Sequence, residues 1–267
     1  MTNWNQLQSE DKPIVVFPTA YFPPISYLVF AKQYDQVAID GGEHYIKQSI
    51  RNRANILSAN GVLSLSVPVS RDKTTRLTSG NIKIDYHTSW QQNHLRAIRS
   101  AYGKTPYFDY YFPDLETIIL SSPKNLIELN KKIINYLFEK MRIKTQILET
   151  TEYVTEPLED YRNAFTKDSN IFNKKNKPYF QAFCNKYPFI EDLSCMDLLF
   201  NMGSESSDYL QFVWIEIDKI RIKGIVFLIH SVETRKQFLI FLLWNNNIWK
   251  HFPNSFSHPQ RNKVLIF

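Results

Sequence analysis

The chain has 267 residues, of which 43% are hydrophobic and 15% aromatic, which is enough for one sizeable core or two small ones. Only seven glycines stand against 13 prolines, and no glycine-rich nucleotide loop, metalloprotease motif or kinase signature occurs. The formal net charge is +6. Residues 211–267 hold eight Lys/Arg against three Asp/Glu and so carry +5 of it, which leaves +1 for residues 1–210. The charge of residues 1–210 therefore gives no indication of nucleic-acid binding.

The N-terminal stretch "MTNWNQLQSEDKP" lacks the basic and apolar regions of a signal peptide. The most apolar run, residues 238–244, is far shorter than the roughly 20 residues that a membrane-spanning helix needs. Two cysteines, Cys184 and Cys195, are too few for a disulfide scaffold and favour a reducing compartment. We therefore expect a cytoplasmic protein without a membrane span.

The first hundred residues read mainly as short strands. Apolar runs predict strands at 13–17 and 36–40, and the prolines after Phe22 can open a helix over about 25–34. Asn60-Gly61 between two apolar runs predicts a β-hairpin, and "NIKIDY" alternates like a further strand.

Helical patterns dominate after Ser89. Ser89 with Gln92 forms a candidate capping box, and Gly103 is placed to end that helix. Ser122-Pro123 predicts the start of a helix that runs to about Met141, and "TQILETTEY" predicts a strand. Residues 159–178 are polar and loop-like, whereas "YFQAFCNKYPF" and "LSCMDLLFN" are patterned like core segments.

Strands that precede and mix with helices predict an α/β or α+β fold, a single domain around one mixed β-sheet with packed helices. Several segments, in the same order, resemble the WbqC-like family: "PTAYFPPISYLVFAKQYDQVAID", "GGEHYIKQSIRNR", "SLSVPVS", "IKIDYHTSWQQNHLRAIRSAYGKTPYFDYYFPD" and "YPFIEDLSCMDLLFNMGSESSDYL". We therefore divide the chain into an N-terminal arm (1–12), a WbqC-like domain (13–210) and a divergent, basic and apolar C-terminal extension (211–267).

The resemblance implies a link to bacterial O-antigen-type polysaccharide biosynthesis, because the family is named from a gene in such a cluster, and it implies no settled activity. The opening block departs from the family pattern. That pattern usually starts with Gln-Pro-Tyr, whereas this chain has Pro18-Thr19-Ala20-Tyr21, so any binding role of the glutamine is absent here.

The first candidate site lies in and after the strand that ends at Asp40, where ligand crevices of open α/β sheets tend to form. Glu43 and His44 offer acid–base chemistry, and three cations offer recognition of a phosphate or carboxylate. If residues 51–53 are extended, both arginines share one face as a cationic stripe. The alternative is a solvated, charged edge strand. The candidate residues are Asp40, Glu43 and His44 as catalytic groups, and Lys47, Arg51, Asn52 and Arg53 as substrate-binding groups.

The second candidate site surrounds the helix after Ser89. Trp90 and His94 share a face with apolar residues at helical spacing, which is typical of core, although Trp90 is also a candidate substrate-binding group and His94 a candidate catalytic group. His87 and His94 are seven residues apart, about 10 Å along a helix, too far to share a metal ion. Tyr107 and Tyr110 belong to a run that predicts either a ring-binding wall facing residues 43–53 or ordinary tyrosine packing.

The cysteines show no zinc-binding spacing, and Cys195 in an apolar run is expected to be buried and inert. We predict no metal and no cofactor. The leading hypothesis is a metal-independent enzyme, a group transferase, that acts on an anionic sugar-nucleotide or acyl intermediate of surface-polysaccharide biosynthesis. The alternative is a non-catalytic binding or scaffold protein that uses the same cleft. The predicted partner is a small anionic ligand; a third class, nucleic-acid binding, depends on the tail's charge alone and is not predicted.

Overall fold

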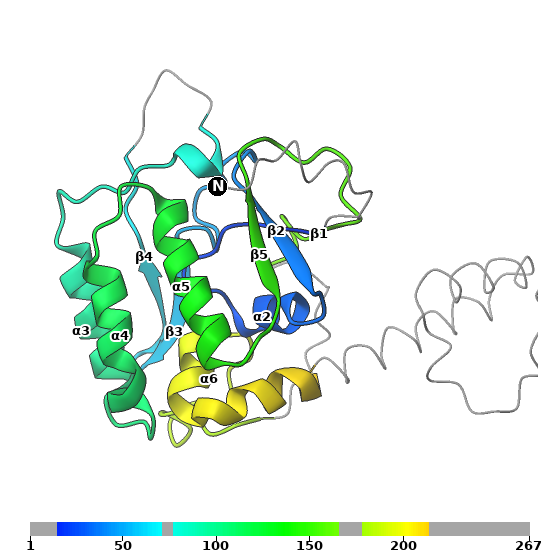
Figure 1. The fold of residues 1–267 in the computed structure, drawn as a ribbon. Coiled ribbons are helices and arrows are strands. Elements are labelled where there is room, and N and C mark those ends of the chain that lie inside the picture. Colours follow the sequence, from blue (N-terminus) through cyan, green and yellow to red (C-terminus); the bar gives the residue numbers. More distant parts are fainter. Residues whose placement is uncertain (1–14, 71–76, 166–177, 214–267) are drawn as a thin grey trace, which may run out of the picture. The chain divides into compact units, whose positions relative to one another are not determined.

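The structure is a computed structural model that describes residues 15–70, 77–165 and 178–213. All of these residues belong to one compact unit of the chain, residues 1–217. The described residues form a four-stranded parallel sheet, a separate two-stranded hairpin, five complete α-helices and a further helical stretch at residues 206–213 (Figure 1). The predicted α/β class is confirmed, but the strands form two sheets, one parallel and one antiparallel, instead of the one mixed sheet expected.

The parallel sheet has the strand order β5-β2-β1-β6. Its strands are β1 (Val15–Phe17), β2 (Gln36–Asp40), β5 (Gln146–Thr150) and β6 (Glu159–Asp160). β1 and β2 lie where apolar runs predicted strands, and β5 lies in the strand predicted from "TQILETTEY", whereas β6 lies in a segment that we expected to be a loop. Because all neighbours are parallel, the carboxyl ends of the four strands lie at one edge of the sheet.

Side chains alternate across this sheet, as the strand geometry requires. One face carries Phe17, Val37 and Ile39 into the large core, and the other face carries Val16 and Ala38 into a small cluster. Both faces are apolar, which explains why the strands read as continuous apolar runs in the sequence.

The hairpin is formed by β3 (Arg53–Ser58) and β4 (Gly61–Ser66). Its register pairs Ala54 with Leu65 and Ser58 with Gly61. Gly61 has a φ of 96°, a conformation that glycine adopts readily, and this confirms the turn predicted from Asn60-Gly61. "NIKIDY" forms only isolated bridges, so the strand predicted there is wrong.

The helices are α2 (Ile25–Ala31), α3 (Trp90–Tyr102), α4 (Phe108–Leu120), α5 (Leu126–Lys140) and α6 (Cys195–Met202), with single 3-10 turns η1 (Ser79–Asn81) and η2 (Gly203–Glu205). Ser89 and Gly103 bound α3 as predicted, but the Ser89 side chain makes no capping hydrogen bond. The start predicted for α5 is wrong by about three residues: Ser122 has a φ of 48°, which cannot begin a helix, and Asn125 is the N-cap.

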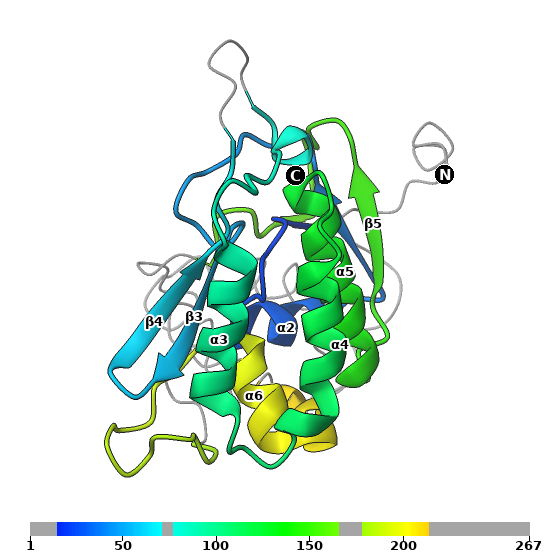
Figure 2. The ribbon, with the colours of Figure 1, turned by 90° about the vertical axis from the view of Figure 1, so that its left-hand side faces the viewer.

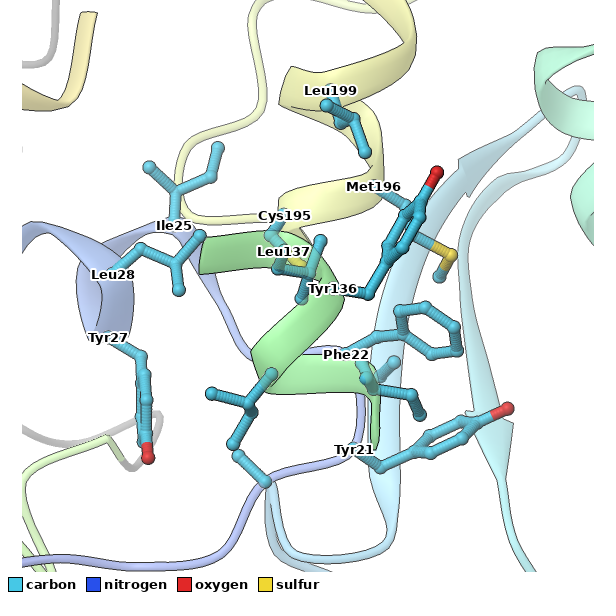
Figure 3. Packing of buried hydrophobic residues seen from close by; sticks show 14 of the residues in the cluster. Tyr21, Phe22, Ile25, Tyr27, Leu28, Tyr136, Leu137, Cys195, Met196 and Leu199 are labelled. Carbon is cyan, nitrogen blue, oxygen red and sulfur yellow. The ribbon is translucent and has the colours of Figure 1, made fainter. Parts of the chain in front are cut away.

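α5 lies beside β2 and β5, and Ile127 and Ile134 of α5 line one small pocket together with Ile39 of β2 and Ile147 of β5. α2, α5 and α6 converge in the main core, which Figure 3 shows from close by. In this core Leu28 of α2, Leu137 of α5 and Met196 of α6 are fully buried. Cys195 is also fully buried, as expected, and burial raises the pKa of its thiol to about 12.

Candidate functional site

The carboxyl edge of the parallel sheet is occupied by a buried network of charged side chains, and Asp40 is its centre. Asp40 is the last residue of β2 and is 0% exposed. Its carboxylate accepts hydrogen bonds from the backbone N–H of Gly42 (2.9 Å) and Glu43 (3.1 Å), from the Thr150 hydroxyl (3.3 Å) and from Nη1 of Arg162 (2.7 Å). These donors compensate for the removal of the Asp40 carboxylate from water.

The chain can turn at this point because two glycines follow Asp40. A Cβ on Gly41 would lie less than 3.0 Å from the Thr150 carbonyl oxygen, and a Cβ on Gly42 would lie less than 3.0 Å from the backbone nitrogen of Tyr153. The backbone of the β2 loop therefore packs directly on the loop that follows β5.

A second buried ion pair lies beside the first. Glu43 accepts from Arg51 through Nε (2.7 Å) and through Nη2, and from the Ser79 hydroxyl (3.1 Å). Nη2 of Arg51 also donates to the backbone carbonyl of Arg162 (3.1 Å), which connects the two pairs. Burial raises the pKa of Glu43 despite the opposing effects of Arg51 and Ser79.

Arg162 was not predicted from the sequence. Besides Asp40, its guanidinium donates to Asp160 and to the Val154 carbonyl (3.1 Å), and its Cζ lies 4.1 Å from the centroid of the Tyr153 ring. The residue lies in a polar segment that has no periodicity. The only available signal was the spacing Asp160-Tyr161-Arg162, which is common in loops.

The predicted cationic stripe of Arg51 and Arg53 is wrong. Residues 49–52 form a turn in which the N–H groups of Asn52 and Arg53 both donate to the Ser49 carbonyl, so extended alternation begins only at Arg53. Arg51 is consequently buried against Glu43, whereas Arg53 is half-buried in β3. Asn52 is buried and donates through Nδ2 to the Val67 carbonyl at 3.0 Å.

His44 and Lys47 are the candidate residues of this segment whose side chains are exposed. The backbone of His44 forms a bridge with Thr78, just before η1, so the β2 loop is also fixed from this side. Solvent-facing groups of the residues that follow β2 and β5 include the His44 imidazole, the Lys47 ammonium group and the Tyr153 ring, which is 53% exposed.

His94 lies apart from this network, on the buried face of α3. Its Nδ1 is hydrogen-bonded to the Tyr21 hydroxyl at 2.9 Å, and its ring meets that of Trp90 edge-on at a centroid distance of 5.1 Å. Burial lowers the pKa of His94 to about 4, so the imidazole is neutral at pH 7. The prediction that the Trp90 face is core is confirmed.

Tyr107 and Tyr110 lie at the start of α4, a helix that we did not predict. Tyr107 is half-buried against Gly203, and Tyr110 is 71% exposed beside Tyr111. α4 packs against α3, α5 and α6. The tyrosine run is therefore a helical surface among other helices, and the predicted wall that faces residues 43–53 is wrong.

Another buried carboxyl, Asp197, lies in the first turn of α6. It accepts hydrogen bonds from the Tyr179 hydroxyl and from Nε2 of Gln181 (2.9 Å), and burial raises its pKa. These bonds fix the segment before α6 onto the helix. No cation pairs with Asp197 among the described residues, in contrast to the sheet edge.

Within the three described ranges, no helix is long and apolar enough to cross a membrane. The same ranges contain no group of three His, Cys, Asp or Glu side chains with the arrangement of a metal site. The absence of a cofactor stays a prediction.

Comparison with known proteins places the chain in a family. The WbqC-like protein family matches residues 19–167, which includes β2, the hairpin and both buried ion pairs. The chain is also 25% identical over 231 residues to a protein named "Uncharacterized protein Rv1507c" from Mycobacterium tuberculosis, covering 75% of this chain and 98% of that protein. No solved structure matches the chain. The family match extends over more than half of the sequence, and the chain belongs to the WbqC-like protein family.

Proposed function

We propose that this protein binds an anionic sugar-nucleotide or acyl intermediate of bacterial surface-polysaccharide assembly at the carboxyl edge of its parallel sheet. The proposed activity is a metal-independent group transfer on that ligand. The family name supports the link to polysaccharide assembly, and the geometry of the buried ion pairs supports the proposed site.

One observation carries the proposal: two ion pairs, Asp40–Arg162 and Glu43–Arg51, are buried where the parallel strands end. Ligands of open α/β sheets bind outside the carboxyl ends of the strands. Burying charged groups costs desolvation energy, and packed apolar side chains of similar volume often give equal or greater stability. The four side chains of these two ion pairs are therefore better explained by ligand binding than by a contribution to stability.

The ion pairs fix the backbone of the β2 loop and of the loop after β5. On this framework the exposed Lys47 offers a charge to an anionic group, and the exposed His44, next to Glu43, offers an imidazole for proton transfer. Arg51, buried against Glu43, is a positioning residue in this scheme.

A specific observation favours the second candidate, binding without catalysis. Among the residues described, neither His44 nor His94 is hydrogen-bonded to a carboxylate, the arrangement that usually orients a catalytic imidazole. Binding by Lys47 and the sheet edge does not need that arrangement.

Thermal-shift measurements on the full chain test the proposal, with nucleotide-sugars, nucleotides and acyl-CoAs as ligands. A ligand that binds the folded state stabilises it by about 2.7 kcal/mol at about a hundred times its Kd. We expect a shift with at least one class, lost in Lys47→Ala and in His44→Ala. If only Lys47→Ala abolishes binding and His44→Ala leaves turnover intact, His44 is not the proton-transfer group.

The matched controls are Lys104→Ala and His87→Ala, which remove an exposed lysine and an exposed histidine. In Figure 2 the turn between α3 and α4, which contains Lys104, lies at the opposite end of the unit from η1. Equal loss of the ligand shift in these controls would contradict a site at the sheet edge.

A further inference from the structure

Asp160 and Arg162 form an ion pair that is partly exposed at the carboxyl end of β6. The Asp160 carboxylate accepts from three donors of Arg162: the backbone N–H (2.9 Å), Nε (2.9 and 3.0 Å) and Nη2 (2.6 Å). The Asp160 side chain is 42% exposed, whereas that of Arg162 is only 5% exposed. A buried guanidinium thus directs one edge of its fork towards a carboxylate at the surface.

The guanidinium is held independently of Asp160. Nη1 donates to the fully buried Asp40 carboxylate (2.7 Å) and to the Val154 carbonyl (3.1 Å), and the Tyr153 ring covers Cζ at 4.1 Å. Moving the Asp160 side chain away would therefore leave Nε, Nη2 and the backbone N–H of Arg162 in place and without an acceptor. Unpaired charged donors of this kind bind an anion strongly.

We propose that Asp160 is an internal stand-in for the ligand, and that an oxyanion of the ligand displaces its carboxylate from Arg162. The inference rests on the proposed function. It identifies Nε, Nη2 and the backbone N–H of Arg162 as the binding site of the anionic group, which we call the seat, and Asp160 as the side chain that leaves when the anion binds. Because Asp40 and Arg162 neutralise each other, an incoming monoanion that replaces Asp160 leaves the local charge unchanged. An anion that arrived without displacing Asp160 would meet an excess of negative charge.

The geometry around Arg162 limits the chemical classes of ligand that can bind there. A guanidinium fork fits the two oxygens of a phosphate or of a carboxylate equally well. The Tyr153 ring beside it is 53% exposed and offers an aromatic face to a sugar or base ring. The shared chemistry is therefore an oxyanion attached to a ring-bearing group.

The test is calorimetric titration of the full chain with pyrophosphate and, separately, with acetate, at constant ionic strength. Asp160→Asn removes the competing carboxylate and retains its size. We expect this variant to bind an oxyanion about tenfold more tightly than wild type, because the ligand no longer competes with the Asp160 carboxylate for the charge-assisted hydrogen bonds of Arg162. A larger gain for pyrophosphate assigns the seat to phosphate groups, and a larger gain for acetate assigns it to carboxylates.

Two further variants make the outcome decisive. Asp114→Asn neutralises an exposed aspartate whose ion-pair partner is Lys140 on α5, and it should bind like wild type. Arg162→Lys in the Asp160→Asn background removes the fork and should abolish the gain. A gain that persists in this double variant, or an Asp160→Asn protein that binds no better than wild type, would overturn the inference.

Asp160→Ser provides the same test if the asparagine variant does not fold, since it too removes the carboxylate. The probes are inorganic or two-carbon anions, so the result does not depend on finding the physiological ligand. If the nucleotide-sugar and acyl-CoA screen fails while Asp160→Asn gains affinity, the proposed substrate class is wrong and the seat stands. If the screen succeeds and the gain is absent, only the role of Asp160 is wrong.

Discussion

The sheet edge around Asp40 and the inner face of α3 around His94 both bury ionisable groups, but they do so in opposite ways. At the sheet edge, carboxylates are buried together with guanidiniums as ion pairs. On α3, a single imidazole is buried among aromatic rings and is kept neutral, since its pKa is lowered to about 4. The sheet edge therefore holds polar side chains that are fixed by one another, whereas the inner face of α3 holds a neutral ring that contributes packing.

The largest expected effect comes from breaking one ion pair at the sheet edge. Arg51→Ala leaves the buried Glu43 carboxylate without its guanidinium, and the free energy of unfolding should fall by about 3–5 kcal/mol. Urea unfolding of the purified variants measures this. Arg99→Ala is the control, because Arg99 forms a surface pair with Glu116 (3.5 Å) at 63% exposure and should contribute at most about 1 kcal/mol. Equal losses in the two variants would contradict the distinction between the pairs.

A pH titration probes the other region. His94 has a folded-state pKa of about 4 against an ordinary value of 6.5, so its contribution to stability is complete above pH 6.5 and is lost as the pH falls towards 4. The shift corresponds to about 3 kcal/mol. We expect the wild type to lose this much more stability than His94→Gln between pH 7 and pH 4. His87→Gln, at an exposed position, should follow the wild type; if His94→Gln does so as well, His94 is not buried as a neutral group.

The close approach of the two loops at the sheet edge predicts a smaller effect. Gly42→Ala places a Cβ against the backbone of Glu152 and Tyr153, which cannot move aside as a side chain can, and should cost about 1–3 kcal/mol. Gly80→Ala is the milder comparison, with its Cβ 3.1 Å from the Gly41 carbonyl oxygen. Thermal unfolding ranks the two, and a Gly42→Ala protein as stable as Gly80→Ala would mean that the loops are less closely packed.

The smallest effect is expected for His44, the exposed histidine that follows Glu43 in the chain. His44→Ala should leave the unfolding midpoint within error of wild type, as His87→Ala should, because surface substitutions away from specific contacts change stability little. A clear destabilisation by His44→Ala alone would indicate a structural role and would weaken its assignment to a ligand.

Local patterns in the sequence were sufficient for much of the fold. The strands that end at Phe17 and Asp40 are apolar runs, and the hairpin follows from Asn60-Gly61. α4 was missed because Pro113 lies inside it, and proline removes a helical hydrogen bond and usually ends a helix. The strand order depends on contacts between residues far apart in the chain, which no local pattern encodes.

The candidate site was predicted in part. Asp40, Glu43 and Arg51 were selected because they follow a strand, and they do lie at the carboxyl edge of the sheet. Their pairing was not predictable, because the turn at residues 49–52 has no strong signal and reverses the expected direction of Arg51. Arg162 joins them across more than a hundred residues, from a polar segment that resembles any surface loop.

The central claim is that the ligand binds at the sheet edge and not at the face of α3. The most direct test is amide chemical-shift mapping of the labelled full chain during titration with pyrophosphate and with a nucleoside diphosphate sugar. The account predicts saturable shifts at Gly42, His44 and Tyr153, and at Arg162, with residues 90–98 unchanged. Shifts concentrated on residues 90–98, with the sheet edge unaffected, would contradict it.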